Sequence, residues 1–294
     1  MLIRHVVNLP LPNSFTAYNL KYMATSNFLS PEQLLNRRTP IDWRDAVKES
    51  PVQTNTKIRK ANELAHQGVA AVLFTAQEVN HRVQELAIIE HVLRNGSMDE
   101  TVYAAILKGG VQFTVPFIRE IALLSPRMNP KVDYIQATRY GKSQQGGEVQ
   151  LVRKLDPKTD ISGKLLMLTD DVTDEGLTLE GIRKIALNPD LCNQLGIGVT
   201  GPAIDVGAVV LGDKQIAEYA GFNPDLLLQG FWLPNAWAGG MGLDGPDEAM
   251  RWLPELVLTT TQDEKYRDSL PEILDILGER AIIGFKDFKW VDKT

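Results

Sequence analysis

The segment from Leu165 to Thr178, where an apolar run passes into a group of carboxylates, constrains this chain more than any other. The apolar residues Leu165–Leu168 predict a buried parallel strand, because strands covered on both faces read as continuous apolar runs. Asp170 and Asp171 leave the carboxyl end of this strand, which is where open α/β sheets bind their ligands. The segment therefore predicts an α/β sheet with a ligand site at one edge.

The turn that follows the strand has the residues of an anion site. Glu175, Gly176, Leu177 and Thr178 can surround a phosphate with backbone N–H groups at the start of a helix. The adjacent carboxylates before the turn suit vicinal sugar hydroxyls, because an ionised carboxylate only accepts hydrogen bonds. Asp174 remains as a candidate proton acceptor. These parts indicate a site for a phosphorylated sugar, and the alternative is a solvated strand-to-helix turn.

The pattern resembles the phosphoribosyl-diphosphate (PRPP) binding motif of the type I phosphoribosyltransferases. In that family four apolar residues precede an acidic pair and a short loop rich in glycine and threonine. The resemblance implies that Asp170 and Asp171 bind the ribose and that Asp174 is the catalytic base. A rival is the Asp-Asp-x-x-Asp magnesium motif of all-helical prenyl-transfer enzymes, but the strand-like run before the motif and Gly176 within it disfavour that reading.

The rest of the chain alternates strands and helices. The predicted strands span 103–107, 132–137, 165–169, 206–211 and 226–231, and the predicted helices span 76–95, 111–124 and 178–187. This alternation predicts an α/β fold with a mainly parallel sheet flanked by helices. The family resemblance adds a small hood.

We predict three parts along the chain: an N-terminal extension over residues 1–70, a phosphoribosyltransferase core with its hood over 71–260, and a C-terminal extension over 261–294. The first part is rich in proline-containing turns and mildly basic, which indicates a packing or subunit surface. We expect residues 1–60 to carry no catalytic group.

Composition narrows the class of protein. The chain has 294 residues, 44% of them apolar, and a net charge of −6, which argues against a nucleic-acid binder. No apolar stretch approaches the roughly 20 residues of a membrane span. Cys192 is the only cysteine, and the N-terminus does not read as a signal peptide. We therefore expect a cytoplasmic protein that binds neither nucleic acid nor membrane.

Two further stretches extend the resemblance to the hypoxanthine-guanine phosphoribosyltransferases. Leu107, Lys108 and Gly109 are similar to their pyrophosphate loop, where the Leu–Lys peptide bond is often cis and glycine lets the backbone approach an anion. Tyr140 and Gly141 resemble the beginning of their mobile lid, which would exclude water from the sugar. Taken alone, the two stretches would be a strand-to-helix turn and a polar hairpin.

The base site is implied by residues nearer the C-terminus. Lys214 resembles the lysine that donates to the purine 6-oxygen, and residues 231–244 resemble the purine-binding segment. Within that segment, Trp237 matches the aromatic residue that stacks on the base, and Ala238 matches a backbone carbonyl that reads the purine edge. Without this context, Lys214 would be a solvated surface charge and Trp237 a core residue.

The same resemblance implies a Mg²⁺ cofactor, with Asp244 and Asp170 as candidate metal ligands and Arg251 as a contact for pyrophosphate. The chain departs from the family pattern in the phosphate loop. Glu175 replaces a small hydroxyl residue there, and Leu177 replaces a frequent basic residue.

We interpret the chain as a purine salvage enzyme that converts hypoxanthine or guanine plus PRPP to IMP or GMP plus pyrophosphate. Two alternatives stay open: a type I phosphoribosyltransferase for another base, such as xanthine or a pyrimidine, and a non-catalytic regulator that senses PRPP. The family habit favours a homo-oligomer, either a dimer or a tetramer.

Overall fold

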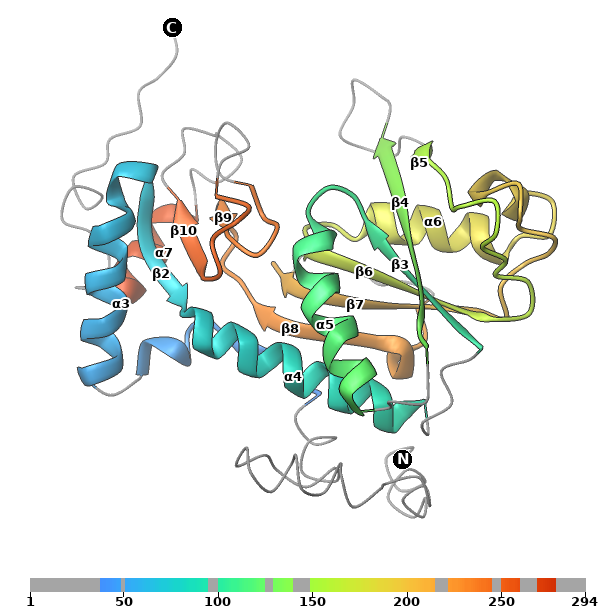
Figure 1. Cartoon of the computed structure of the whole chain (residues 1–294). Coiled ribbons are helices and arrows are strands. Elements are labelled where there is room, and N and C mark those ends of the chain that lie inside the picture. Colours follow the sequence, from blue (N-terminus) through green and yellow to red (C-terminus); the bar gives the residue numbers. More distant parts are fainter. Residues whose placement is uncertain are drawn as a thin grey trace, which may run out of the picture.

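A seven-stranded sheet forms the centre of the computed structural model, which describes residues 38–48, 51–94, 100–124, 129–139, 149–214, 222–244, 250–259 and 269–278 (Figure 1). From one edge to the other its strands are β1 (Ile41–Asp42), β8 (Leu227–Trp232), β7 (Asp205–Asp213), β6 (Leu165–Thr173), β3 (Thr101–Ile106), β4 (Lys131–Arg139) and β5 (Val149–Arg153). All neighbouring strands are parallel except the antiparallel pair of β4 and β5. This arrangement confirms the predicted α/β fold.

Helices cover both faces of the sheet. α4 (Ala76–Leu93) and α5 (Gly110–Leu124) lie on one face, and α6 (Leu177–Leu187) lies on the other (Figure 1). Successive side chains of a strand point to opposite faces, so each central strand contributes to two cores. One core takes Tyr103, Met167, Val209 and Leu211. The other takes Ala104, Leu166, Leu168 and Val210.

Local sequence explains where α4 begins and how it is attached to the sheet. Thr75 caps the helix, since its hydroxyl accepts from the Glu78 N–H and the Glu78 carboxylate accepts from the Thr75 N–H at 2.7 Å. Further along α4, the buried Arg82 donates to the carbonyl oxygens of Gly230 and Gln229, each at 3.0 Å. The helix is thereby bonded to β8.

A second, three-stranded antiparallel sheet stands beside the first. It consists of β2 (Val69–Phe74), β10 (Leu256–Thr259) and β9 (Ala238–Gly239), with α3 (Pro51–Leu64) and α7 (Leu270–Leu277) near it (Figure 1). Short 3₁₀ turns occupy Ala46–Lys48, Ala65–Gln67, Cys192–Leu195 and Pro224–Leu226. The predicted boundary near residue 70 falls inside β2, and β1 of the predicted N-terminal extension belongs to the main sheet. The three-part division itself stays a prediction.

The register of the parallel strands brings three strand ends to one edge of the main sheet. Thr173 of β6 is level with Asp213 of β7, and Asp213 is level with Trp232 of β8. The segments that leave these strands therefore start side by side. Within the described part of the chain, every helix is too short or too polar to span a bilayer.

Candidate active site

The carboxylate pair lies within the central strand. We expected β6 to end at residue 169, but it continues to Thr173, so Asp170 and Asp171 belong to the strand and do not follow it. β6 is paired with β7 from Leu165 to Asp170 and again at Val172 and Thr173, and pairing on both sides of Asp171 keeps the strand extended through the two aspartates. The Asp171 N–H donates to Oδ1 of Asp170 at 3.0 Å.

Burial disfavours the ionised form of both carboxyl groups. Burial, followed by the nearby charge of Asp171, raises the pKa of Asp170 well above its usual range. Burial also raises the pKa of Asp171, although its hydrogen bond with Asp170 and the charge of Arg251 oppose this. Hydroxyl donors or a cation placed here would stabilise the ionised form of the pair.

The loop after β3 lies directly against this pair. The peptide bond between Leu107 and Lys108 is cis, as the family resemblance implied. A methyl group at Gly109 would lie 2.0 Å from Oδ2 of Asp171, so any larger residue here would displace the Asp171 carboxylate. At Gly110 a methyl group would lie 2.7 Å from the carbonyl oxygen of Thr169. The two consecutive glycines therefore bring the loop onto the end of β6.

The start of α5 is bonded to the same strand. The Thr114 hydroxyl lies 2.6 Å from the Thr169 hydroxyl and 2.6 Å from the carbonyl oxygen of Gly110. These contacts hold the loop that carries Lys108, whose own side chain is exposed.

A third segment, the hood loop of residues 240–244, closes over the first two. Gly242 has φ +106, and a methyl group there would lie 2.1 Å from the carbonyl oxygen of Gly109. Arg251 holds this loop by donating to the Gly242 carbonyl at 2.7 Å and to Oδ2 of Asp244 at 2.5 Å. The Trp237 indole N–H donates to the backbone carbonyl of Asp244 at 2.5 Å. The structure thus joins Trp237, Asp244 and Arg251 in one network.

Asp174 and Lys214 form a second group at the same edge. Nζ of Lys214 lies 2.8 Å from Oδ1 of Asp174, and the Lys214 N–H donates to the carbonyl oxygen of Thr173 at 3.1 Å. The Lys214 side chain is 6% exposed and that of Asp174 is 34% exposed. Lys214 is therefore a buried, paired lysine, and not the solvated surface charge that its position alone would suggest.

The predicted phosphate turn joins β6 to α6. Gly176 adopts a left-handed conformation with φ 74 at the position before the first residue of α6, which is Leu177. Leu177 is exposed, while Glu175 and Thr178 are half-buried. The turn therefore presents the N-terminus of α6 at the same sheet edge as Asp174.

Of the remaining predicted site residues, the structure describes Ala238 but not the two lid residues. Tyr140 and Gly141 of the predicted lid lie outside the described residues. Ala238 is buried and lies in β9, where it pairs with Leu258 of β10. Among the described residues, no cluster of three or more metal-binding side chains is present.

Sequence reasoning missed the importance of Gly242 and the hydroxyl pair of Thr114 and Thr169. Gly242 lies in a glycine-rich run, which indicates that the backbone approaches another group closely. The sequence does not show that this group is the Gly109 carbonyl. Thr114 is an ordinary helix residue in the sequence, and no local pattern distinguishes it.

Known proteins with a similar sequence are phosphoribosyltransferases. Residues 75–200 match the family described as the phosphoribosyl transferase domain. The chain is 30% identical over 189 residues to the hypoxanthine-guanine phosphoribosyltransferase of Aquifex aeolicus (strain VF5), covering 64% of this chain and 93% of that protein. It is 26% identical over 178 residues to the protein of the same name from Bacillus subtilis (strain 168), covering 60% of this chain and 86% of that one.

A solved structure of the Trypanosoma cruzi hypoxanthine phosphoribosyl transferase superposes with a TM-score of 0.53 at 24% identity, over 68% of this chain and 96% of that one. This likeness shows a shared fold. About a third of this chain lies outside each of these alignments.

Proposed function

The chain belongs to the type I phosphoribosyltransferase family, among relatives of the hypoxanthine-guanine branch, and on that premise we propose that it transfers the phosphoribosyl group of PRPP to a 6-oxopurine. The products are IMP from hypoxanthine, or GMP from guanine, together with pyrophosphate. In this reaction the C1′–O bond to the diphosphate breaks and a C1′–N9 bond forms, while the base loses a proton.

The ion pair between Asp174 and Lys214 carries the proposal. N7 and the 6-oxygen lie on the same edge of a purine, and a 6-oxopurine with a proton on N7 presents one donor beside one acceptor. A carboxylate 2.8 Å from an ammonium offers the complementary pair. Asp174 accepts the N7 proton as general base, and Lys214 donates to the 6-oxygen.

The same pair would also exclude adenine. An ammonium donates three hydrogen bonds and accepts none, so the 6-amino group of adenine would face Lys214 without an acceptor. Sites built on such a polar contact reject the mismatched analogue by about 10⁴–10⁵. Trp237 stacks on any purine, and backbone carbonyls near Ala238 would accept from the guanine 2-amino group.

The sugar and its phosphates are bound at the adjacent strand end. Asp170 and Asp171 accept hydrogen bonds from the ribose hydroxyls, which offsets the cost of keeping two neighbouring carboxyl groups ionised. The N-terminal turn of α6 receives the 5′-phosphate through the backbone N–H groups of residues 175–178. Lys108, Gly109 and Arg251 surround the departing pyrophosphate.

The oxygen donors present suit Mg²⁺. This ion keeps most of its water and is held by one or two carboxylates together with substrate phosphates, so a preformed cluster of three side chains is not required. Asp170 and Asp244 are the residues that would hold it. When bound, the ion supplies charge neutralisation to the leaving diphosphate.

One assay tests the proposal: initial rates with PRPP, magnesium and a panel of hypoxanthine, guanine, xanthine, adenine and uracil, for wild type and Lys214→Ala. We expect turnover of hypoxanthine and guanine, no turnover of adenine, and loss of discrimination in the variant. Preference for adenine or uracil would refute the base assignment. PRPP binding without turnover of any base would instead favour the PRPP-sensing regulator. The homo-oligomer and the cytoplasmic setting stay predictions.

A further inference from the structure

The base segment, defined here as Phe231–Ala238, is held from two sides by parts of the chain outside the predicted core of residues 71–260. The N-terminal clamp is residues 38–48, and the C-terminal clamp is residues 269–277. The segment includes Trp237 and Ala238, which the proposed function assigns to the purine.

The N-terminal clamp continues the main sheet beyond β8. Ile41 pairs with Phe231 and Asp42 with Trp232 in parallel register, and the Trp43 N–H donates to the Trp232 carbonyl at 3.2 Å. Backbone hydrogen bonds of this kind fix the height and direction of the strand from which the base segment leaves.

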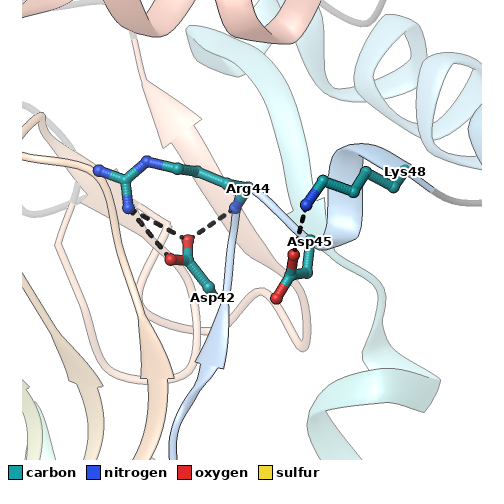
Figure 2. A network of polar contacts seen from close by, with 4 residues as sticks. All are labelled: Asp42, Arg44, Asp45 and Lys48. Atoms are coloured by element: carbon teal, nitrogen blue, oxygen red, sulfur yellow. Dashed lines mark hydrogen bonds and ion pairs between the residues drawn. The ribbon is translucent and has the colours of Figure 1, made fainter.

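A polar turn of four charged residues, Asp42, Arg44, Asp45 and Lys48, surrounds the buried tryptophan of this clamp in the sequence, and Figure 2 shows its contacts. Asp42 accepts from the Arg44 N–H at 2.8 Å and from its guanidinium at 3.1 Å, while Lys48 pairs with Asp45 at 2.9 Å. The Arg44 guanidinium lies 5.3 Å from the centre of the Trp43 ring, and Trp43 is 2% exposed. The turn therefore directs the indole inward, into the core that also contains Leu233 and Ala236.

The C-terminal clamp reaches the base segment itself. The Ser269 hydroxyl donates to the backbone carbonyl of Asn235 at 2.5 Å, two residues before Trp237. Behind this contact, Ile273 and Leu277 of α7 are buried in the same core as Leu233 and Ala236. One side chain thus ties the segment to a helix that follows the core in sequence.

We propose that the two clamps position the base segment, so that Asp42, Trp43 and Ser269 are positioning residues for the base site. The inference rests on the proposed function. The proposed contacts with the ribose and the 5′-phosphate come from β6 and the start of α6. The hydrogen bonds of the two clamps described above involve neither element. Loosening a clamp should therefore weaken binding of the base more than binding of PRPP, whose proposed pyrophosphate contacts reach the base segment only through the bond between Trp237 and Asp244.

The test compares Asp42→Ala and Ser269→Ala with Ser162→Ala as the matched control. The Ser162 hydroxyl donates to Oδ1 of Asp160 at 2.5 Å and to the Gly201 carbonyl at 3.1 Å, away from the base segment. Wild type and all four variants, including Ser269→Thr, are assayed for KM of base, KM of PRPP and kcat, and for hydrogen–deuterium exchange over residues 231–238. Ser269→Thr, which keeps the hydroxyl, serves as the rescue variant.

We expect both clamp variants to exchange faster over 231–238 and to raise the KM of the base by about three- to tenfold, the range for one lost hydrogen bond. The KM of PRPP should rise by a smaller factor than the KM of the base, and Ser162→Ala and Ser269→Thr should behave as wild type. Unchanged exchange, or equal rises in both KM values, would overturn the inference. A wild type inactive with every base would refute the proposed function, while the exchange data would still decide whether the clamps hold the segment.

Discussion

Replacing Gly242 with alanine should disable the site without unfolding the protein. The hood loop and the pyrophosphate loop meet at this residue, where an added methyl group would lie 2.1 Å from the Gly109 carbonyl oxygen and 3.1 Å from Cβ of Asp171. Side-chain carbons essentially never approach such atoms within 3.0 Å, so one loop must move by about 1 Å. The φ of +106 adds backbone strain for any residue with a Cβ.

The loop displacement sets the expected loss of rate, and the backbone strain sets the expected loss of stability. A displacement of about 1 Å at a site that positions reacting groups costs about 10²-fold in rate. The strained conformation costs about 1–3 kcal/mol of unfolding free energy. We therefore expect kcat/KM to fall by about 100-fold, with a stability loss small enough to leave the variant folded.

Gly163→Ala is the matched control. Gly163 also has positive φ, +65, but an added methyl group there would meet nothing within 4 Å. Steady-state kinetics with hypoxanthine and PRPP, together with thermal unfolding, should show a stability loss in both variants and a rate loss only in Gly242→Ala. Near wild-type activity in Gly242→Ala, or an equal rate loss in Gly163→Ala, would refute the reasoning.

Three further predictions concern carboxyl groups. Asp174→Asn keeps the shape but removes the proton acceptor, so single-turnover rates should fall by about 10²–10⁴-fold with PRPP binding kept; a near wild-type rate would exclude Asp174 as the base. Because burial and Asp171 raise the pKa of Asp170, its contribution to stability is present at acid pH and is lost as pH rises through the folded pKa. Asp170→Asn should therefore unfold at a higher temperature than wild type at pH 8, and the difference should shrink toward pH 4; a constant difference would contradict this. Hydrogen bonds lower the pKa of Asp160 from 3.8 to about 2, the largest effect coming from the Ser162 hydroxyl and smaller ones from the Ser162 N–H and from Thr200. The stabilisation by Asp160 is therefore present above pH 3.8 and is lost as pH falls through about 2. An NMR titration of Ser162→Ala should show the Asp160 pKa returning toward 3.8, and an unchanged value would show that another donor is responsible.

The phosphate turn shows how the chain can differ from the family pattern. The side chain of Leu177 is exposed, so this position contributes a backbone N–H at the start of α6 and no apolar contact with the core. If this turn binds the 5′-phosphate, as we propose, the backbone N–H groups and the helix N-terminus would bind it without a basic side chain at residue 177. Glu175 lies in the same turn, and its carboxylate would have to point away from the phosphate for this arrangement to bind an anion.

The sequence by itself determined the α/β architecture. The apolar run before Asp170, the alternation of strands with amphipathic helices, and the Lys108–Gly110 loop are short-range patterns. In such patterns the backbone conformation follows from residues a few positions apart. For this reason the central strands and helices were predicted to within a few residues. β4 and β7 each extend two residues past their predicted ends at 137 and 211, and β6 extends past the aspartates to Thr173, where it pairs with β7.

Only the tertiary structure decided which distant segments meet. Ile41 pairs with Phe231, the β2 run Val69–Phe74 pairs with β10, and Gly242 lies against Gly109. The sequence marked several of these residues as apolar or glycine, but hydrophobic periodicity tells which face of a strand is buried and not which strand lies beside it. Pairing and register depend on how all the elements pack around a common core. That packing turned the lysine after β7 into the buried partner of Asp174.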